Sequence, residues 1–260
     1  MKKVLLNSIL DFTTQLEKLA AKIAGEFDVE DIHHFRTTAK KLRSLLRWQK
    51  QHKNTLPSSF VKDYHITGEL RNMQLLLIRF NEEKIVLPHF MVWITNEIAR
   101  LQRDWIRNKK KKSLKKLSRK LLGLKWSRLS RTSLETFFQE KMDALHIILQ
   151  LPEPPDDQLH EIRKIIKDIY YTRQWCKKHW KAGWEASAKF SLAPLDKLSD
   201  QAGNYNDEST GLLLLTHYLR DEKDRKALKA AAAVRQKLER EKQDSRIKLI
   251  DSIRHFVKRV

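Results

Sequence analysis

Residues 33–43 read HHFRTTAKKLR, and residues 160–167 read HEIRKIIK. Both stretches place a base three residues after a histidine and a lysine seven residues after it. Because an α-helix completes a turn about every 3.6 residues, side chains at these offsets line up along one narrow face. Each stretch therefore predicts a helix with a ladder of cations along one side.

The first ladder continues beyond the quoted residues and has an apolar back. It comprises His33, Arg36, Lys40, Arg43 and Arg47, and the opposite face carries Phe35, Ala39, Leu42 and Leu46. Like charges at such spacings destabilise a helix by roughly a few tenths of a kcal/mol per pair. A chain that builds this arrangement twice is therefore predicted to bind an anion that relieves the repulsion.

The composition predicts a folded protein with an anionic partner. Lys and Arg number 53 against 32 Asp and Glu, so the formal net charge is +21, and 41% of the residues are hydrophobic. That hydrophobic fraction excludes a disordered tail, and 260 residues suffice for one large domain or two compact halves. The charge imbalance favours nucleic acid, polyphosphate or an anionic membrane surface as partner.

Cysteine content and hydropathy bear on location. Cys176 is the only cysteine, so no intrachain disulfide can form, and we expect a reducing, cytoplasmic setting. The apolar run after Met1 is broken by Asn7 and Asp11, so we interpret this stretch as a first amphipathic helix rather than a signal peptide. No apolar stretch approaches the ~20 residues that span a bilayer, so we expect no transmembrane segment.

Apolar residues recur at helical spacing along nearly the whole chain, which predicts an all-α fold. The expected helices cover residues 2–24, 29–52, 57–80, 89–121, 133–150, 157–189, 194–221 and 223–257. Each ladder opens the second helix of a group of four, and a glycine segment follows each, at 67–72 and 203–207. This order predicts an internal duplication with an N-terminal half 1–121, a connector 122–132 and a C-terminal half 133–260. Two four-helix bundles with approximate symmetry would bring both ladders near a common surface.

The ordered set of segments resembles the CHAD family, the conserved histidine α-helical domains. Residues 31–46 are similar to its first signature, residues 159–167 with Tyr171 to its second, and residues 68–71 and 203–207 to its two glycine segments. The resemblance covers essentially the whole chain, 1–260. It implies a single CHAD-type unit of two pseudo-symmetric four-helix bundles with a central basic cavity, and an association with inorganic polyphosphate.

The resemblance also implies an anion-binding set. Carried over residue by residue, it comprises His33, Arg36, Lys40, Lys41, Arg43, His160, Arg163, Lys164 and Lys167. Two further candidates come from the ladders themselves. Arg47 extends the first ladder. In the second ladder, Asp168 and Tyr170 stand at positions where the family usually continues with bases, and Lys178 lies further along the same face. Arg suits such a site because its planar fork matches two phosphate oxygens, while Lys acts as a compact point charge.

The ladder histidines have a second interpretation. His33 and His160 could each lie buried where two helices cross, with a hydrogen bond to the backbone. Because both are followed by bases at the same offsets, anion contact is favoured. We predict no metal site and no cofactor, since neither a cysteine pair nor a His-Glu-x-x-His pattern supplies ligands.

The densest basic run lies outside both ladders, at residues 107–121. Within it Leu114, Leu117 and Leu121 keep helical spacing, which predicts a long solvated helix rather than a disordered arm. Its cations could extend the binding surface or contact nucleic acid. The seven tryptophans mostly fall within apolar helical patterns, so we expect them in the core rather than stacked on bases.

We expect a non-enzymatic protein that binds inorganic polyphosphate through a groove lined by both ladders. Two alternatives stay open. The charge permits general nucleic-acid binding, although the chain lacks a zinc finger, an evident helix-turn-helix glycine turn and an RNP-type aromatic strand. A hydrolase acting on phosphate chains would need clustered carboxylates for Mg²⁺ or the glycines of a P-loop, and the sequence supplies neither.

Overall fold

The computed structural model of the chain describes residues 2–51, 56–109 and 113–260. Within these ranges it contains helices and connecting segments but no strand, which confirms the all-α prediction. No helix in this part of the chain has the length and apolar character needed to cross a bilayer. The helices are α1 (Lys2–Glu26), α2 (Val29–Trp48), α3 (Ser58–Glu82), α4 (Pro88–Lys109), α5 (Ser113–Leu122), α6 (Arg131–Leu149), α7 (Asp156–His179), α8 (Lys181–Ala186), α9 (Leu192–Asp221) and α10 (Arg225–Arg259).

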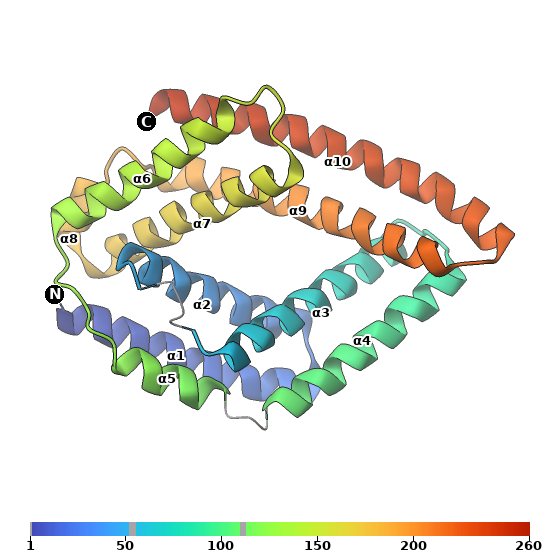
Figure 1. Cartoon of the computed structure of the whole chain (residues 1–260), viewed down its shortest axis with the longest axis horizontal. Helices are drawn as coiled ribbons and strands as arrows, with labels where there is room; N and C mark the ends of the chain where they lie inside the picture. Colours follow the sequence, from blue (N-terminus) through green and yellow to red (C-terminus); the bar gives the residue numbers. More distant parts are fainter. Residues whose placement is uncertain (1, 52–55, 110–112) are drawn as a thin grey trace.

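The helices form two groups that meet where α2 packs against α7 (Figure 1). α1 to α5 occupy the lower half of the view, and α6 to α10 occupy the upper half. α3 lies beside α2, α9 lies beside α7, and α3 also touches α9. These four helices therefore surround the middle of the molecule. The approximate symmetry of two four-helix bundles, with boundaries at 121 and 133, stays a prediction.

Helix α2 is fixed at its start and along one face. Asp28 caps it, because its Oδ1 accepts hydrogen bonds from the backbone N–H groups of Glu30 and Asp31, each at 2.9 Å. On the apolar side Phe35 is completely buried, and its ring meets Trp105 edge-on with centroids 5.5 Å apart. This burial sets the rotation of α2 about its axis, and so it sets the direction in which the first ladder points.

The single helix predicted at 89–121 is wrong. It corresponds to α4 and α5, which run in different directions in Figure 1. Residues 110–112, between them, lie outside the described residues. The physical reason for the change of direction is burial. Leu117 and Leu121 on α5 are fully buried, and α5 packs against α1 and α3 rather than continuing along the line of α4.

The single helix predicted at 157–189 is also wrong, because it is divided at Trp180. The backbone of Trp180 is extended (φ −151°, ψ 91°), which ends α7 and starts α8. Its ring stacks on that of Trp48 on α2, with centroids 5.8 Å apart. The break is therefore associated with tertiary packing, and the apolar periodicity of the sequence does not reveal it.

Gly183 allows the Trp180 ring to lie against α8. A Cβ at position 183 would overlap the indole, whereas a Cβ at Gly203, inside α9, would have no neighbour within 4 Å. We expect Gly183→Ala to lower the free energy of unfolding by about 1–3 kcal/mol, since the ring must shift away. We expect Gly203→Ala to raise it by up to about 1 kcal/mol through helix propensity. Denaturant titration measures both, and equal effects of the two substitutions would contradict this account of the break.

Candidate functional site

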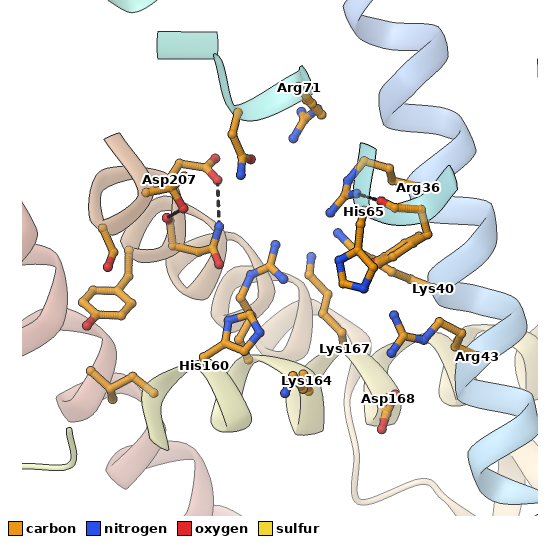
Figure 2. A pocket seen from close by; sticks show the side chains of 18 of the residues that line it. Arg36, Lys40, Arg43, His65, Arg71, His160, Lys164, Lys167, Asp168 and Asp207 are labelled. Atoms are coloured by element: carbon orange, nitrogen blue, oxygen red, sulfur yellow. Dashed lines mark hydrogen bonds between the residues drawn. The ribbon is translucent and has the colours of Figure 1, made fainter. Parts of the chain in front are cut away.

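The two ladders face each other across a cavity of about 550 Å³ in the middle of the molecule (Figure 2). Eight Lys and Arg side chains line this central cavity, together with His65 and His160, against three Asp. The cations are Arg36, Lys40, Arg43 and Arg47 on α2, Arg71 on α3, and Arg163, Lys164 and Lys167 on α7. Such a concentration of one sign between low-dielectric walls focuses a positive potential in the cavity.

A glycine allows Arg36 to lie against α3. Arg36 Nη1 donates a hydrogen bond to the backbone carbonyl of Tyr64 at 2.6 Å, and the guanidinium carbon lies 4.5 Å from the centre of the Tyr64 ring. A Cβ at Gly68 would overlap the guanidinium. The first glycine segment therefore gives the first ladder room to approach α3. The pKa of Arg36 is lowered, first by burial and then by the nearby charges of Arg163 and Arg71.

Two arginines of the cavity have incomplete hydrogen bonding. The Nε atoms of Arg71 and Arg163 are buried and have no acceptor among the described residues. A buried N–H group without an acceptor raises the free energy of the folded state, so such groups in a native protein call for an explanation. Both side chains belong to the lining of the central cavity, so an anion bound there would bring the acceptors that the protein lacks.

Lys40 lies among cations from three helices. Its pKa is lowered to about 6, first by burial and then by the charges of Arg163, Arg36, Lys167 and Arg71. Without a ligand, Lys40 is therefore largely an uncharged amine above neutral pH. An anion in the cavity would reverse the balance and favour the ammonium form.

The pKa values of Lys167 and His160 in the cavity are also lowered. Burial lowers the pKa of Lys167 to about 8, with a further contribution from Arg163, and its ammonium donates to Ser199 Oγ. Partial burial also lowers the pKa of His160, followed by the charges of Lys164 and Arg163. Figure 2 shows His160 and Lys167 projecting from α7 into the same space as Lys40 from α2.

The carboxylates of the cavity have partners within the protein. Asp168 Oδ2 lies 2.7 Å from Arg47 Nε and 2.8 Å from Lys141 Nζ. Asp156 pairs with Lys242 and Arg246 of α10, and Asp207 accepts a hydrogen bond from Asn206 at 3.3 Å. Among the eight lining cations, only Arg47 and Lys164 form an ion pair within the described residues, Lys164 with Glu161. The other six form no ion pair in this part of the chain, and five of them, all except Lys40, keep their charge at neutral pH.

Eight of the eleven predicted site residues line the central cavity, and three lie elsewhere. His33 is one turn before Arg36, and its Nε2 lies 3.4 Å from Thr37 Oγ1. Lys41 is five residues after Arg36, which places it about 140° around α2. It lies near Lys178, whose charge adds to burial in lowering the pKa of Lys41. Lys178 is four turns beyond Arg163 along α7.

Helices α3 and α9 contribute lining residues that the ladders did not predict. They are Tyr64, His65, Arg71 and Asn72 on α3, and Tyr205, Asn206, Asp207, Ser209, Thr210 and Leu213 on α9. Arg71 could have been found, since it lies one turn after Gly68 and two turns after Tyr64 on the same face. The residues of α9 follow no charge pattern, and the sequence signal for them is the second glycine segment, 203–207, which contains Tyr205, Asn206 and Asp207.

Comparison with known proteins agrees with this architecture. The family model of the CHAD domain matches residues 9–216 of the chain. This chain belongs to the CHAD domain family. Among solved structures, the crystal structure of the CHAD domain from the plant Ricinus communis has a similar fold, with a TM-score of 0.77 and 15% sequence identity. The similarity covers 98% of this chain and 91% of that chain. No curated protein sequence matches the chain. All eight lining cations lie within the part that matches the CHAD domain.

The low pKa of Lys40 predicts a rise in the stability of this CHAD domain with pH. The pKa is about 6 in the folded state against 10.5 for an exposed lysine, so the unfolded chain binds one more proton between these values. The free energy of unfolding should therefore rise from pH 7 to pH 8.5, above the range in which histidines titrate. In Lys40→Met this slope should be smaller, by at most about 1.4 kcal/mol per pH unit. Urea denaturation at several pH values measures it, and parallel slopes for the two proteins would refute the role of Lys40.

Proposed function

We propose that this chain binds inorganic polyphosphate in the central cavity and catalyses no reaction on it. The observation that carries the proposal is the convergence of eight Lys and Arg side chains from three helices on one cavity. Six of them have no carboxylate partner within the described residues. A chain with a negative charge on every phosphate provides acceptors at short intervals, which suits cations stacked one turn apart on α2 and α7.

The aromatic residues of the cavity favour a ligand without bases. Proteins that bind single-stranded nucleic acid usually stack bases on accessible aromatic rings. Here the Tyr64 ring already carries Arg36 and Arg43, whose guanidinium carbons lie 4.5 and 5.0 Å from its centre. Tyr171 and Tyr205 are buried, at 7% and 3% exposure. The cavity thus offers cations without a stacking surface, and a bare phosphate chain fits that chemistry better than a nucleotide does.

The proposal is tested with a variant that removes unpaired charge without breaking a structural contact. Arg71→Gln with Arg163→Gln should weaken binding of long-chain polyphosphate by about 10- to 100-fold per residue, because each loses a charge-assisted hydrogen bond. It should also reduce the salt dependence of binding, since fewer counterions are released. Isothermal titration calorimetry at two salt concentrations measures both quantities.

The matched control is Arg240→Gln with Lys248→Gln, two exposed cations on α10 that do not line the central cavity. This variant should bind as the unchanged protein does. Tighter binding of single-stranded DNA than of polyphosphate at equal charge would overturn the proposal in favour of general nucleic-acid binding. Release of phosphate from the chain in the presence of Mg²⁺ would overturn its non-enzymatic part.

Binding of polyphosphate should draw protons from solution. At pH 7.5 Lys40 is mostly neutral in the empty cavity, since its pKa is about 6, and a dense negative charge restores the ammonium form. Calorimetry in two buffers of different ionisation enthalpy measures the number of protons taken up. We expect Lys40→Arg, which is charged throughout, to bind with a smaller uptake. An unchanged uptake in Lys40→Arg would assign the protons to other groups.

A further inference from the structure

More than half of the net charge lies in one stretch whose described residues do not line the central cavity. Twelve Lys and Arg and no Asp or Glu lie between Asp104 and Glu135, against a net charge of +21 for the whole chain. Leaving aside residues 109–112, whose side chains the structure does not describe, none of them lines the central cavity. The central cavity therefore accounts for only part of the charge imbalance, and this stretch needs an explanation of its own.

Helix α5 presents part of this charge on its solvent side. Its apolar side, with Leu117 and Leu121 fully buried, packs on α1 and α3. Lys115, Lys116, Arg119 and Lys120 are exposed on the other side. At about 100° per residue these four positions spread over an arc of roughly 140°. The first ladder is a narrow row, whereas this is a broad convex face.

The exposed cations continue past the end of α5 on an anchored segment. Lys125 and Arg128 are exposed, while Trp126 and Leu129, beside them, are 5% and 4% exposed. The Trp126 indole N–H donates to the carbonyl of Leu121 at 3.0 Å, and the Gln51 amide donates to the carbonyl of Lys125 at 3.1 Å. We call Lys115, Lys116, Arg119, Lys120, Lys125 and Arg128 together the α5 face. Figure 1 places α5 and this segment at the edge of the molecule.

The α5 face differs from the other basic surface, on α10. There four of the twelve cations pair with carboxylates: Arg235 with Glu239, Lys237 with Glu83, and both Lys242 and Arg246 with Asp156. On the α5 face, Lys115, Lys116 and Arg119 form no ion pair within the described residues, although they are neighbours one turn apart. Like charges so placed weaken a helix, and an anionic partner removes that penalty.

We propose that the α5 face is a docking surface for the phosphate backbone of double-stranded nucleic acid, bound without sequence preference. A duplex carries one charge per ~1.7 Å of its axis on two separate strands, so it offers phosphates across a broad area. That width matches cations spread around a convex face, whereas a thin single chain matches a narrow row. Single strands are disfavoured further, because the aromatic residues of this stretch, Trp105 and Trp126, are buried and give bases nothing to stack on.

An anionic membrane is the weaker candidate for the α5 face. Surface helices that bind membranes insert an apolar side between the lipid headgroups. The apolar side of α5 is already covered by α1 and α3. Leu122, at 50% exposure, is the one exposed apolar side chain of this helix and lies beside its cations, about 20° from Lys115. The charge of the α5 face is complementary to a phosphate backbone without any such insertion.

The test uses the full chain and a variant with Lys115, Lys116, Arg119 and Arg128 each changed to Gln. Gln forms helices well and removes the like-charge repulsion, so the variant should fold, which circular dichroism checks. Fluorescence anisotropy with a labelled short DNA duplex should show Kd at least about tenfold higher than in the unchanged protein. The slope of log Kd against log salt should fall by up to about 3.6, at roughly 0.9 for each of the four phosphates that the variant no longer neutralises.

Two controls make the outcome specific. Arg225, Lys229, Arg240 and Lys248, all exposed on α10, are changed to Gln in a variant of equal net charge. The α10 variant should bind the duplex nearly as tightly as the unchanged protein does. An equal loss of duplex affinity in the α5-face and α10 variants would overturn the proposal, because net charge alone would then explain binding. The Arg71→Gln, Arg163→Gln cavity variant should also keep duplex binding, and its loss there would overturn the proposal by placing the duplex at the central cavity.

Two further binding experiments test polyphosphate and an anionic membrane as partners of the α5 face. Long-chain polyphosphate should bind the α5-face variant as tightly as the unchanged protein. A loss of polyphosphate binding with duplex binding intact would overturn the proposal and make the α5 face an extension of the cavity. Vesicles containing phosphatidylserine should bind weakly, and if they bind through the α5 face while the duplex does not, the nucleic-acid assignment is wrong.

Discussion

The burial of two apolar helix faces is the constraint on which the rest of this structure depends. α2 and α7 each turn an apolar side into the core, with Phe35 and Ile162 completely buried. Because the two helices pack against each other, their cation ladders are brought to one central cavity. The apolar burial, worth about 1.5–3 kcal/mol for each large side chain, outweighs the repulsion of like charges that it creates. The packing of the apolar faces of α2 and α7 therefore determines where the cations of the cavity lie.

The protein limits this repulsion by three local devices. Lys40 loses its proton readily, since burial and four neighbouring cations lower its pKa to about 6. Asp168 stands in the second ladder and pairs with Arg47 and Lys141. Tyr64 covers Arg36 and Arg43 with its ring, which is a favourable position for a cation. These devices leave five lining cations charged and without an ion pair within the described residues, which is the chemical basis for the proposed polyanion ligand.

The parts of the molecule that follow helical periodicity could be predicted from the sequence. The all-α fold and the eight ladder residues that line the cavity rest on spacings of three, four and seven. What escaped prediction depends on contacts between distant segments. The break at Trp180 goes with stacking on Trp48, and the lining residues of α9 are placed by the packing of α9 on α7 and α3. The position of Lys41 outside the cavity could have been predicted, because its offset of five residues from Arg36 turns it away from the ladder face.

The two basic surfaces differ in a way that net charge does not describe. In the central cavity cations from facing helices surround a small volume, so a partner must be narrow enough to enter, and each phosphate of the proposed ligand would meet several donors at once. On the α5 face the cations radiate from a convex surface, so a partner must be wide, and each phosphate meets few donors. In the binding modes proposed above, affinity at the first surface would rest on buried, charge-assisted hydrogen bonds, whereas affinity at the second would rest on counterion release and weaken steeply with salt. The curvature of the surface that carries the cations, more than their number, therefore decides which polyanion each one suits.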